Sequence, residues 1–393
     1  MDNNAPNSLP SNNLQTNPTQ PQNLSSVNNP VDSTTPPQGQ QANINPYIDT
    51  SKIACWDETQ QLITQLEQAF NGKVLVLYIP YGARLVDDDT KEIYNHIEKI
   101  GKAEKINLII YGPGGSGIAA YKIVKLIRSY FKNFTVIAPS VAASAMTMLT
   151  LGADQILTGP LTSFSPIDTS ITNHPLAPID QNKRPVSVEI QQVQKYLEMA
   201  QSEKFSQNGD FSQSVFATLS EKVHPLLLGT IQRSLSLSKL LTGSILKTHM
   251  NDEEKISKIV NTLNDQYPIH SYPIMKEDFE EMGLNVQEMT KEQNYITIDL
   301  FSYYDLLSRT VRKNGKEKST TVRQNFLESS GFRSYYWSQI DREYVDGKWI
   351  EIGSADGYTR AVMVRNKKGF FEVAPLGTKD FRKWMKNETF EIE

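Results

Sequence analysis

Two short stretches, Tyr111-Gly-Pro-Gly-Gly-Ser-Gly117 and Ala142-Ala-Ser-Ala-Met146, decide how this sequence folds. Each follows a short apolar run and precedes a segment with apolar residues at helical spacing, so each predicts a junction between a strand and a helix. The first stretch offers backbone N–H groups on a glycine turn, and the second places the hydroxyl of Ser144 at the start of a helix. Such a pair provides the parts of an acyl-transfer site, an oxyanion hole and a nucleophile.

Strands and helices alternate on both sides of these stretches, which predicts an α/β fold with a mostly parallel sheet flanked by helices. Beyond Pro185 the pattern becomes mainly helical. The strands are expected at residues 73–80, 107–111, 135–138 and 155–158, and the helices at 53–70, 87–100, 118–131, 143–151, 187–203, 212–223, 225–248, 252–264 and 276–283.

The two ends of the chain differ from this central part. Residues 1–45 consist mainly of Asn, Gln, Pro, Ser and Thr, so they are expected to form a disordered tail. Residues 46–290 are expected to form the α/β domain. Residues 291–393 are expected to form a small appended region with a helix at 299–310 and short antiparallel strands at 348–353, 360–365 and 370–374.

Composition excludes several classes of function. A formal net charge of −4 gives no electrostatic case for nucleic-acid binding. The single cysteine, Cys55, excludes an intramolecular disulfide and fits a reducing compartment. No signal peptide and no apolar run long enough to span a bilayer is visible, so a cytoplasmic protein is expected. No metal-binding or cofactor motif is visible, so neither kind of group is expected.

The glycine stretch also satisfies the pattern G-x-G-x-x-G of dinucleotide-binding folds through Gly112, Gly114 and Gly117. However, the following strand ends in Ile137-Ala-Pro-Ser140, without the acidic residue that holds the ribose. A P-loop is excluded because no Gly-Lys-Ser/Thr follows. A plain tight turn is the remaining alternative, and the nearby Ala-Ala-Ser-Ala favours the oxyanion interpretation.

The order of several motifs resembles the serine dehydrogenase proteinase family, a branch of the Clp-fold serine peptidases in the Clp-protease/crotonase superfamily. That family has S-P-G-G, then A-x-S-A-G-T, then G-P-I-D-P. This chain has Gly-Pro-Gly-Gly115, Ala142-Ala-Ser-Ala-Met-Thr147 and Ser165-Pro-Ile-Asp-Thr169. Further similar stretches, Val223-His-Pro-Leu-Leu-Leu-Gly229, Tyr267-Pro-Ile-His-Ser-Tyr-Pro-Ile274 and Glu281-Met-Gly-Leu284, extend the resemblance over about residues 50–290.

The resemblance implies a serine peptidase that acts on a peptide or protein substrate and forms a homo-oligomer. Ser144 matches the family's nucleophile, and the backbone N–H groups of Gly114, Gly115 and Ala145 are the candidate oxyanion donors. The Clp proteolytic subunit has a histidine where this chain has Asp168, and an aspartate near the place of His270. A triad of Ser144, His270 and Asp168 with exchanged positions is therefore expected.

Other bases and other functions stay open. His174 and Lys183 are alternative bases, while His96 and His249 are expected on solvated helix faces and His224 at a helix start. Met146, where the family has glycine, is expected to narrow the acyl pocket. A non-catalytic scaffold or adaptor with the same fold, and a crotonase-like acyl-CoA enzyme, are the alternative functions.

Overall fold

The computed structural model describes residues 55–167, 170–171, 175–181, 186, 188–201, 212–309, 312–314, 318–345, 348–365 and 371–376. The expected tail at residues 1–45 lies outside this part of the chain. The helices are α1 (Trp56–Ala69), α2 (Asp87–Ile100), α3 (Gly117–Tyr130), α4 (Ala145–Thr150), α5 (Ile190–Gln201), α6 (Ser212–Lys222), α7 (Pro225–Leu246), α8 (Glu253–Asn261), the π-helical turn η2 (Thr262–Gln266), α9 (Lys276–Glu281) and α10 (Lys291–Arg309).

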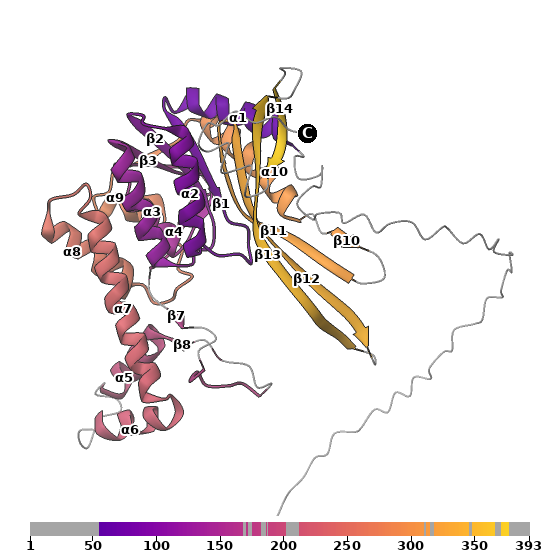
Figure 1. Ribbon diagram of the computed structural model, residues 1–393. Coiled ribbons are helices and arrows are strands. Elements are labelled where there is room, and N and C mark those ends of the chain that lie inside the picture. The colour runs from indigo at the N-terminus through magenta and orange to yellow at the C-terminus, as the bar shows by residue number, and fades with distance from the viewer. Residues whose placement is uncertain are drawn as a thin grey trace, which may run out of the picture. The chain divides into compact units, whose positions relative to one another are not determined.

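The strands are β1 (Lys73–Tyr78), β2 (Lys105–Tyr111), β3 (Asn133–Ala138), β4 (Val141–Ala142), β5 (Gln155–Thr158), β6 (Ser163–Phe164), β7 (Ser170–Ile171), β8 (Val188–Glu189), β9 (Val286–Glu288), β10 (Arg312–Asn314), β11 (Lys318–Ser329), β12 (Phe332–Val345), β13 (Lys348–Arg365) and β14 (Phe371–Leu376). Figure 1 shows their arrangement. These elements confirm the α/β alternation and most of the expected helix and strand positions. Among the described residues, none of the helices combines the length and apolar character needed to cross a bilayer.

One sheet carries the fold. Its strands follow the order β14-β13-β12-β11-β1-β2-β3-β5-β9. Strands β1, β2, β3, β5 and β9 pair in parallel, as the α/β pattern predicts, whereas β11 joins β1 antiparallel and continues into β12, β13 and β14. The carboxyl ends of β2 and β3 therefore meet at one edge of the parallel half, where ligands bind in open α/β sheets.

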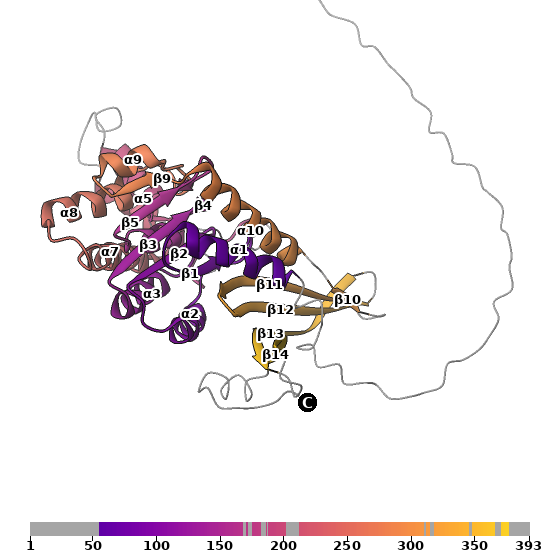
Figure 2. The ribbon, with the colours of Figure 1, turned by 90° about the horizontal axis from the view of Figure 1, so that it is seen from above.

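Helices cover both faces of this sheet (Figure 2). Along β1 the apolar side chains alternate: Leu75 and Leu77 pack in a core with α2 and α3, while Val74 and Val76 pack in a second core with α1 and α10. Each of these side chains is fully buried. The near-continuous apolar run of β1 follows from this two-sided burial.

The C-terminal strands differ from the short appended strands expected from the sequence. Strands β11, β12 and β13 span 12, 14 and 18 residues. They lie in the main sheet because residues 326–329 of β11 pair with β1. The turn-like residues between 353 and 358 interrupt the local strand pattern, yet β13 runs through them because β12 pairs with it along that length. Cross-strand pairing therefore overrode the local signal.

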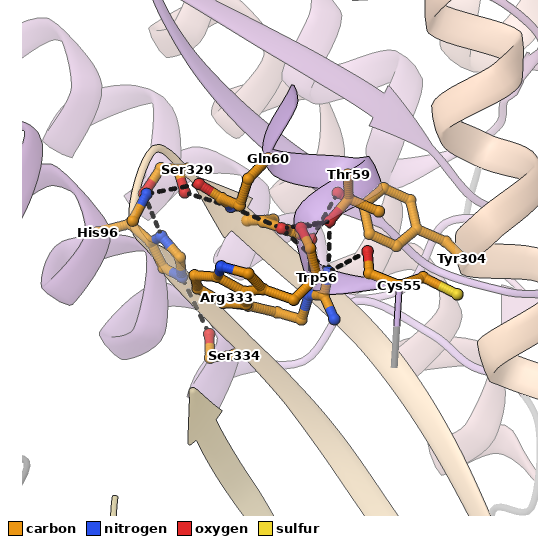
Figure 3. A network of polar contacts seen from close by, with 11 residues as sticks. Cys55, Trp56, Thr59, Gln60, His96, Tyr304, Ser329, Arg333 and Ser334 are labelled. Atoms are coloured by element: carbon orange, nitrogen blue, oxygen red, sulfur yellow. Dashed lines mark hydrogen bonds and ion pairs between the residues drawn. The ribbon is translucent and has the colours of Figure 1, made fainter. Parts of the chain in front are cut away.

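A buried polar network fastens this C-terminal hairpin to α1 and α10 (Figure 3). The side chains of Glu328 and Arg333 are completely buried, and Arg333 Nε donates to Glu328 Oε2 at 2.7 Å. Tyr304 donates its hydroxyl to the same carboxylate at 2.9 Å, and Thr59 donates to the other oxygen at 2.8 Å. The guanidinium carbon Cζ of Arg333 also lies 5.3 Å from the centroid of the Trp56 ring. These partners offset the cost of burying two charges.

His96 on α2 belongs to the same region, which corrects its expected place on a solvated helix face. Its ring is fully buried, stacks on Phe332 at 3.9 Å and lies between two hydroxyls. Nδ1 is 2.8 Å from Oγ of Ser329, and Nε2 is 3.0 Å from Oγ of Ser334. Burial, with a smaller effect of the nearby Arg360 charge, lowers the pKa of His96 to about 3. His249, also expected on a solvated helix face, instead lies in the turn after α7 and is partly buried. His224 caps α7 as expected.

The buried His96 predicts an acid-sensitive fold. Because its folded-state pKa lies below the unfolded value of about 6.5, the neutral ring contributes stability that is complete above that pH. This contribution is lost as the pH falls toward about 3. We expect His96→Gln to reduce the dependence of the unfolding free energy on pH by up to about 1.4 kcal/mol per pH unit between pH 6 and 4. Urea unfolding of both proteins across this range measures the difference, and equal slopes would contradict the assignment.

Candidate active site

The backbone at Ser144 is held in an unusual conformation. Ser144 immediately precedes α4 and has φ of 52° and ψ of −114°, outside the regions that residues with a side chain favour. Such backbone typically costs about 1–3 kcal/mol and persists only where its surroundings fix it. Ser144 is partly exposed, and its side chain does not cap the helix. The sharp turn from β4 into α4 leaves the hydroxyl available at the helix start.

The glycine loop at residues 112–116 lies directly against this turn. Gly112 donates its N–H to Val141 and accepts the N–H of Ala143, both at 3.0 Å. A Cβ atom on Gly114 would lie 2.6 Å from the Cβ of Ser144. Gly114 also has a φ of 110°, a conformation that glycine alone adopts readily. The backbone therefore brings the two motifs into contact, as the sequence predicts.

A third segment, ending at Leu85, lies on the other side of the glycine loop. Leu85 donates its N–H to the carbonyl of Gly114 and accepts the N–H of Ser116, both at 2.8 Å. Because the peptide is planar and trans, the N–H of Gly115 points opposite to the Gly114 carbonyl and therefore away from Leu85. The bridge thus fixes the direction of a backbone donor.

The segment that carries Leu85 is held in turn by a C-terminal strand. Asn325, at a β-bulge in β11 with φ of 47°, donates its amide to the carbonyl of Arg84 at 3.0 Å and to the carboxylate of Asp89. Asp89 also accepts the N–H of Val86 at 2.7 Å and the hydroxyl of Tyr358. Burial raises the pKa of Asp89 to about 6, against the opposing effect of these hydrogen bonds.

A cavity of about 690 Å³ brings the described candidates together. Gly114, Gly115, Ser144, Ala145 and His270 all line it. Its remaining walls are formed by the segment 83–87, the start of α3, part of α7, Met148 and Ile167. Asp168, His174 and Lys183 lie outside the described residues, so the geometry speaks only for the serine, the loop and His270.

Met146 does not narrow this cavity, contrary to the expectation from the sequence. Its side chain is fully buried in the core beneath α4, whereas Ala145 and Met148 line the cavity. The helical rotation of about 100° per residue places Met146 on the core side of α4. The methionine that borders the cavity is the one two residues later.

The sequence reasoning missed the role of Ser165, which follows β6. Its Oγ accepts the N–H of Ser144 at 2.8 Å, so this donor is already engaged. By contrast, no hydrogen-bond partner is found for the N–H of Gly114, Gly115 or Ala145 in the part of the chain that the structure describes. Ser165 begins the motif Ser165-Pro-Ile-Asp, but no local pattern in the sequence indicates that its hydroxyl reaches Ser144.

Comparisons with known proteins agree with this fold. Residues 59–222 match the family of ClpP-like SDH-type serine proteinases, which confirms the resemblance and the ClpP-like fold expected from the sequence. Two uncharacterized proteins of Methanocaldococcus jannaschii are 25% and 24% identical over 57% of this chain, covering 68% and 66% of their own lengths.

The solved structures to which this chain is similar share less of its sequence. ClpP1 from Listeria monocytogenes is 14% identical, covers 60% of this chain and 99% of its own, and has a TM-score of 0.31. The membrane-bound stomatin-specific protease 1510-N is also 14% identical, covers 58% of this chain and 82% of its own, and has a TM-score of 0.29.

The close approach of the glycine loop to Leu85 yields a test. A Cβ on Gly115 would lie 2.3 Å from the Leu85 carbonyl oxygen, and Gly115 has a φ of 143°. We expect Gly115→Ala to lower the unfolding free energy by about 2–4 kcal/mol, from strain and overpacking together. Gly82→Ala is the matched control: its φ is +91°, yet no atom lies within 4 Å of the added Cβ. Equal losses in the two variants, measured by urea unfolding, would contradict the clash.

Proposed function

We propose that this chain is a serine peptidase that cleaves peptide bonds through an acyl-enzyme on Ser144. One observation carries the proposal: a serine with strained backbone at a helix start faces a glycine loop in a cavity that His270 also lines. The match of residues 59–222 to a family of serine proteinases supports the reaction class.

In the first step, the Ser144 Oγ attacks the carbonyl carbon of a peptide bond while a base takes its proton. The negative charge that develops on the carbonyl oxygen is accepted by backbone N–H groups. Gly114, Gly115 and Ala145 are the proposed donors, because all three line the cavity and none of their N–H groups has a partner among the described residues. Removal of one such donor typically costs about 2.7–4 kcal/mol of transition-state stabilisation.

His270 is the proposed base, and Asp168 is proposed to orient it. His270 lies beyond the residues that match the family, so its role rests on its place in the cavity wall. As the intermediate collapses, the protonated imidazole gives its proton to the departing amine. Water then attacks the acyl-enzyme with the same base, which releases the second product and restores Ser144.

The nucleophile is tested with a fluorophosphonate probe, which labels activated serines. We expect the wild-type protein to be labelled on Ser144 and Ser144→Ala to lose labelling while keeping its melting temperature. Ser140→Ala is the matched control, because Ser140 lies in the bend between β3 and β4 and does not line the cavity. A wild-type protein that is never labelled would point to the scaffold or the crotonase-like alternative.

The base is tested by substitution and by pH. We expect His270→Ala to lower peptide hydrolysis as severely as Ser144→Ala, and the double variant to be no worse, because a triad acts as a unit. Wild-type activity should rise with pH through about 6–7, since general-base catalysis requires a neutral imidazole. Normal hydrolysis by His270→Ala, combined with loss of activity in His174→Ala or Lys183→Ala, would move the role of base to one of those residues.

A further inference from the structure

Ser165 makes a buried contact with the backbone of the candidate nucleophile that the proposed reaction does not use. Its side chain is almost fully buried, and its Oγ accepts the N–H of Ser144 at 2.8 Å. The same hydroxyl donates its proton to the carbonyl of Pro166 at 3.2 Å. Because the proton is directed to Pro166, a lone pair of the oxygen faces Ser144. The hydroxyl is therefore oriented before any substrate arrives.

A second hydroxyl joins Ser165 to both ends of the turn at Ser144. The N–H of Ser165 donates to Oγ1 of Thr147 on α4 at 3.1 Å. Thr147, which is fully buried, donates its own hydroxyl to the carbonyl of Ala142 on β4 at 2.7 Å. The hydrogen bonds of Ser165 and Thr147 thus connect the strand before Ser144, the helix after it and the N–H of Ser144 itself.

This arrangement stabilises the strained backbone conformation of Ser144. A residue with a side chain at φ 52° and ψ −114° keeps that conformation only where its surroundings hold it. Rotation about these angles would carry the Ser144 N–H away from the fixed oxygen of Ser165. The buried hydrogen bond therefore favours the one backbone conformation that presents the Ser144 hydroxyl beside the glycine loop.

We propose that Ser165 is a positioning residue that holds the Ser144 backbone in its reactive conformation. The proposal rests on the proposed function in that Ser144 is taken as the nucleophile. The bond also engages the Ser144 N–H, so this group is not among the proposed oxyanion donors Gly114, Gly115 and Ala145.

The chemical test compares Ser165→Ala with Thr150→Val. Thr150 is the matched control, because its buried hydroxyl also makes one hydrogen bond near Ser144, to the carbonyl of Met146 within α4, and does not line the cavity. We expect Ser165→Ala to slow fluorophosphonate labelling and to lower kcat about 10- to 100-fold with an unchanged KM, since small displacements of a reacting group have effects of this size. Thr150→Val should stay within about twofold of the wild type. Wild-type rates in Ser165→Ala, or equal losses in both variants, would overturn the proposal.

The structural test does not depend on chemistry. Amide hydrogen exchange of the peptide covering residues 141–148, followed by mass spectrometry, should be about tenfold faster in Ser165→Ala and unchanged in Thr150→Val. If the wild-type protein fails to label, the proposed function fails, but this comparison still decides whether Ser165 holds Ser144. Unchanged exchange in Ser165→Ala would overturn the positioning role even in an active enzyme.

Discussion

Gly114 and Gly115 lie so close to the turn at Ser144 and to the segment that ends at Leu85 that neither position has room for a side chain. A Cβ on Gly114 would meet Ser144, and a Cβ on Gly115 would meet the backbone of Leu85. This exclusion lets three backbone segments approach one another at the end of the parallel sheet. The direction of the Gly115 N–H, the placement of Ser144 and one wall of the cavity all depend on that approach.

The site also depends on strands that follow it late in the sequence. Asn325 in β11 holds the carbonyl of Arg84, next to the residue that bridges to the glycine loop. The bulge and the positive φ at Asn325 are what turn its amide toward Arg84 and Asp89. The extension of the sheet beyond β1 is therefore part of the support of the candidate active site rather than a separate attachment.

Buried polar groups connect the hairpin of β11 and β12 to helices α1 and α10, and so determine how this extension of the sheet packs. Glu328 and Arg333 satisfy each other and also bind Thr59 and Tyr304, which come from helices far apart in the sequence. Truncation of either charged residue would leave its partner charged and buried, at a cost of about 3–5 kcal/mol. The pairing of β11 with β1 is thereby linked to the docking of α1 and α10.

The sequence by itself determined the α/β alternation, the two loops at the ends of β2 and β3, and the candidate nucleophile, because these are encoded by local periodicity and by glycine. The periodicity of α2 also placed His96 beside inward-facing Ile93 and Ile97, but its polar character suggested a solvated face. Only the tertiary structure showed that this ring forms hydrogen bonds with the hydroxyls of Ser329 and Ser334. It also showed that Met146 faces the core and that Ser165 accepts the N–H of Ser144. Each of these depends on contacts between segments distant in the chain, which no local pattern records. The long course of β13 has the same origin, because pairing with β12 overrides the turn-like residues within it.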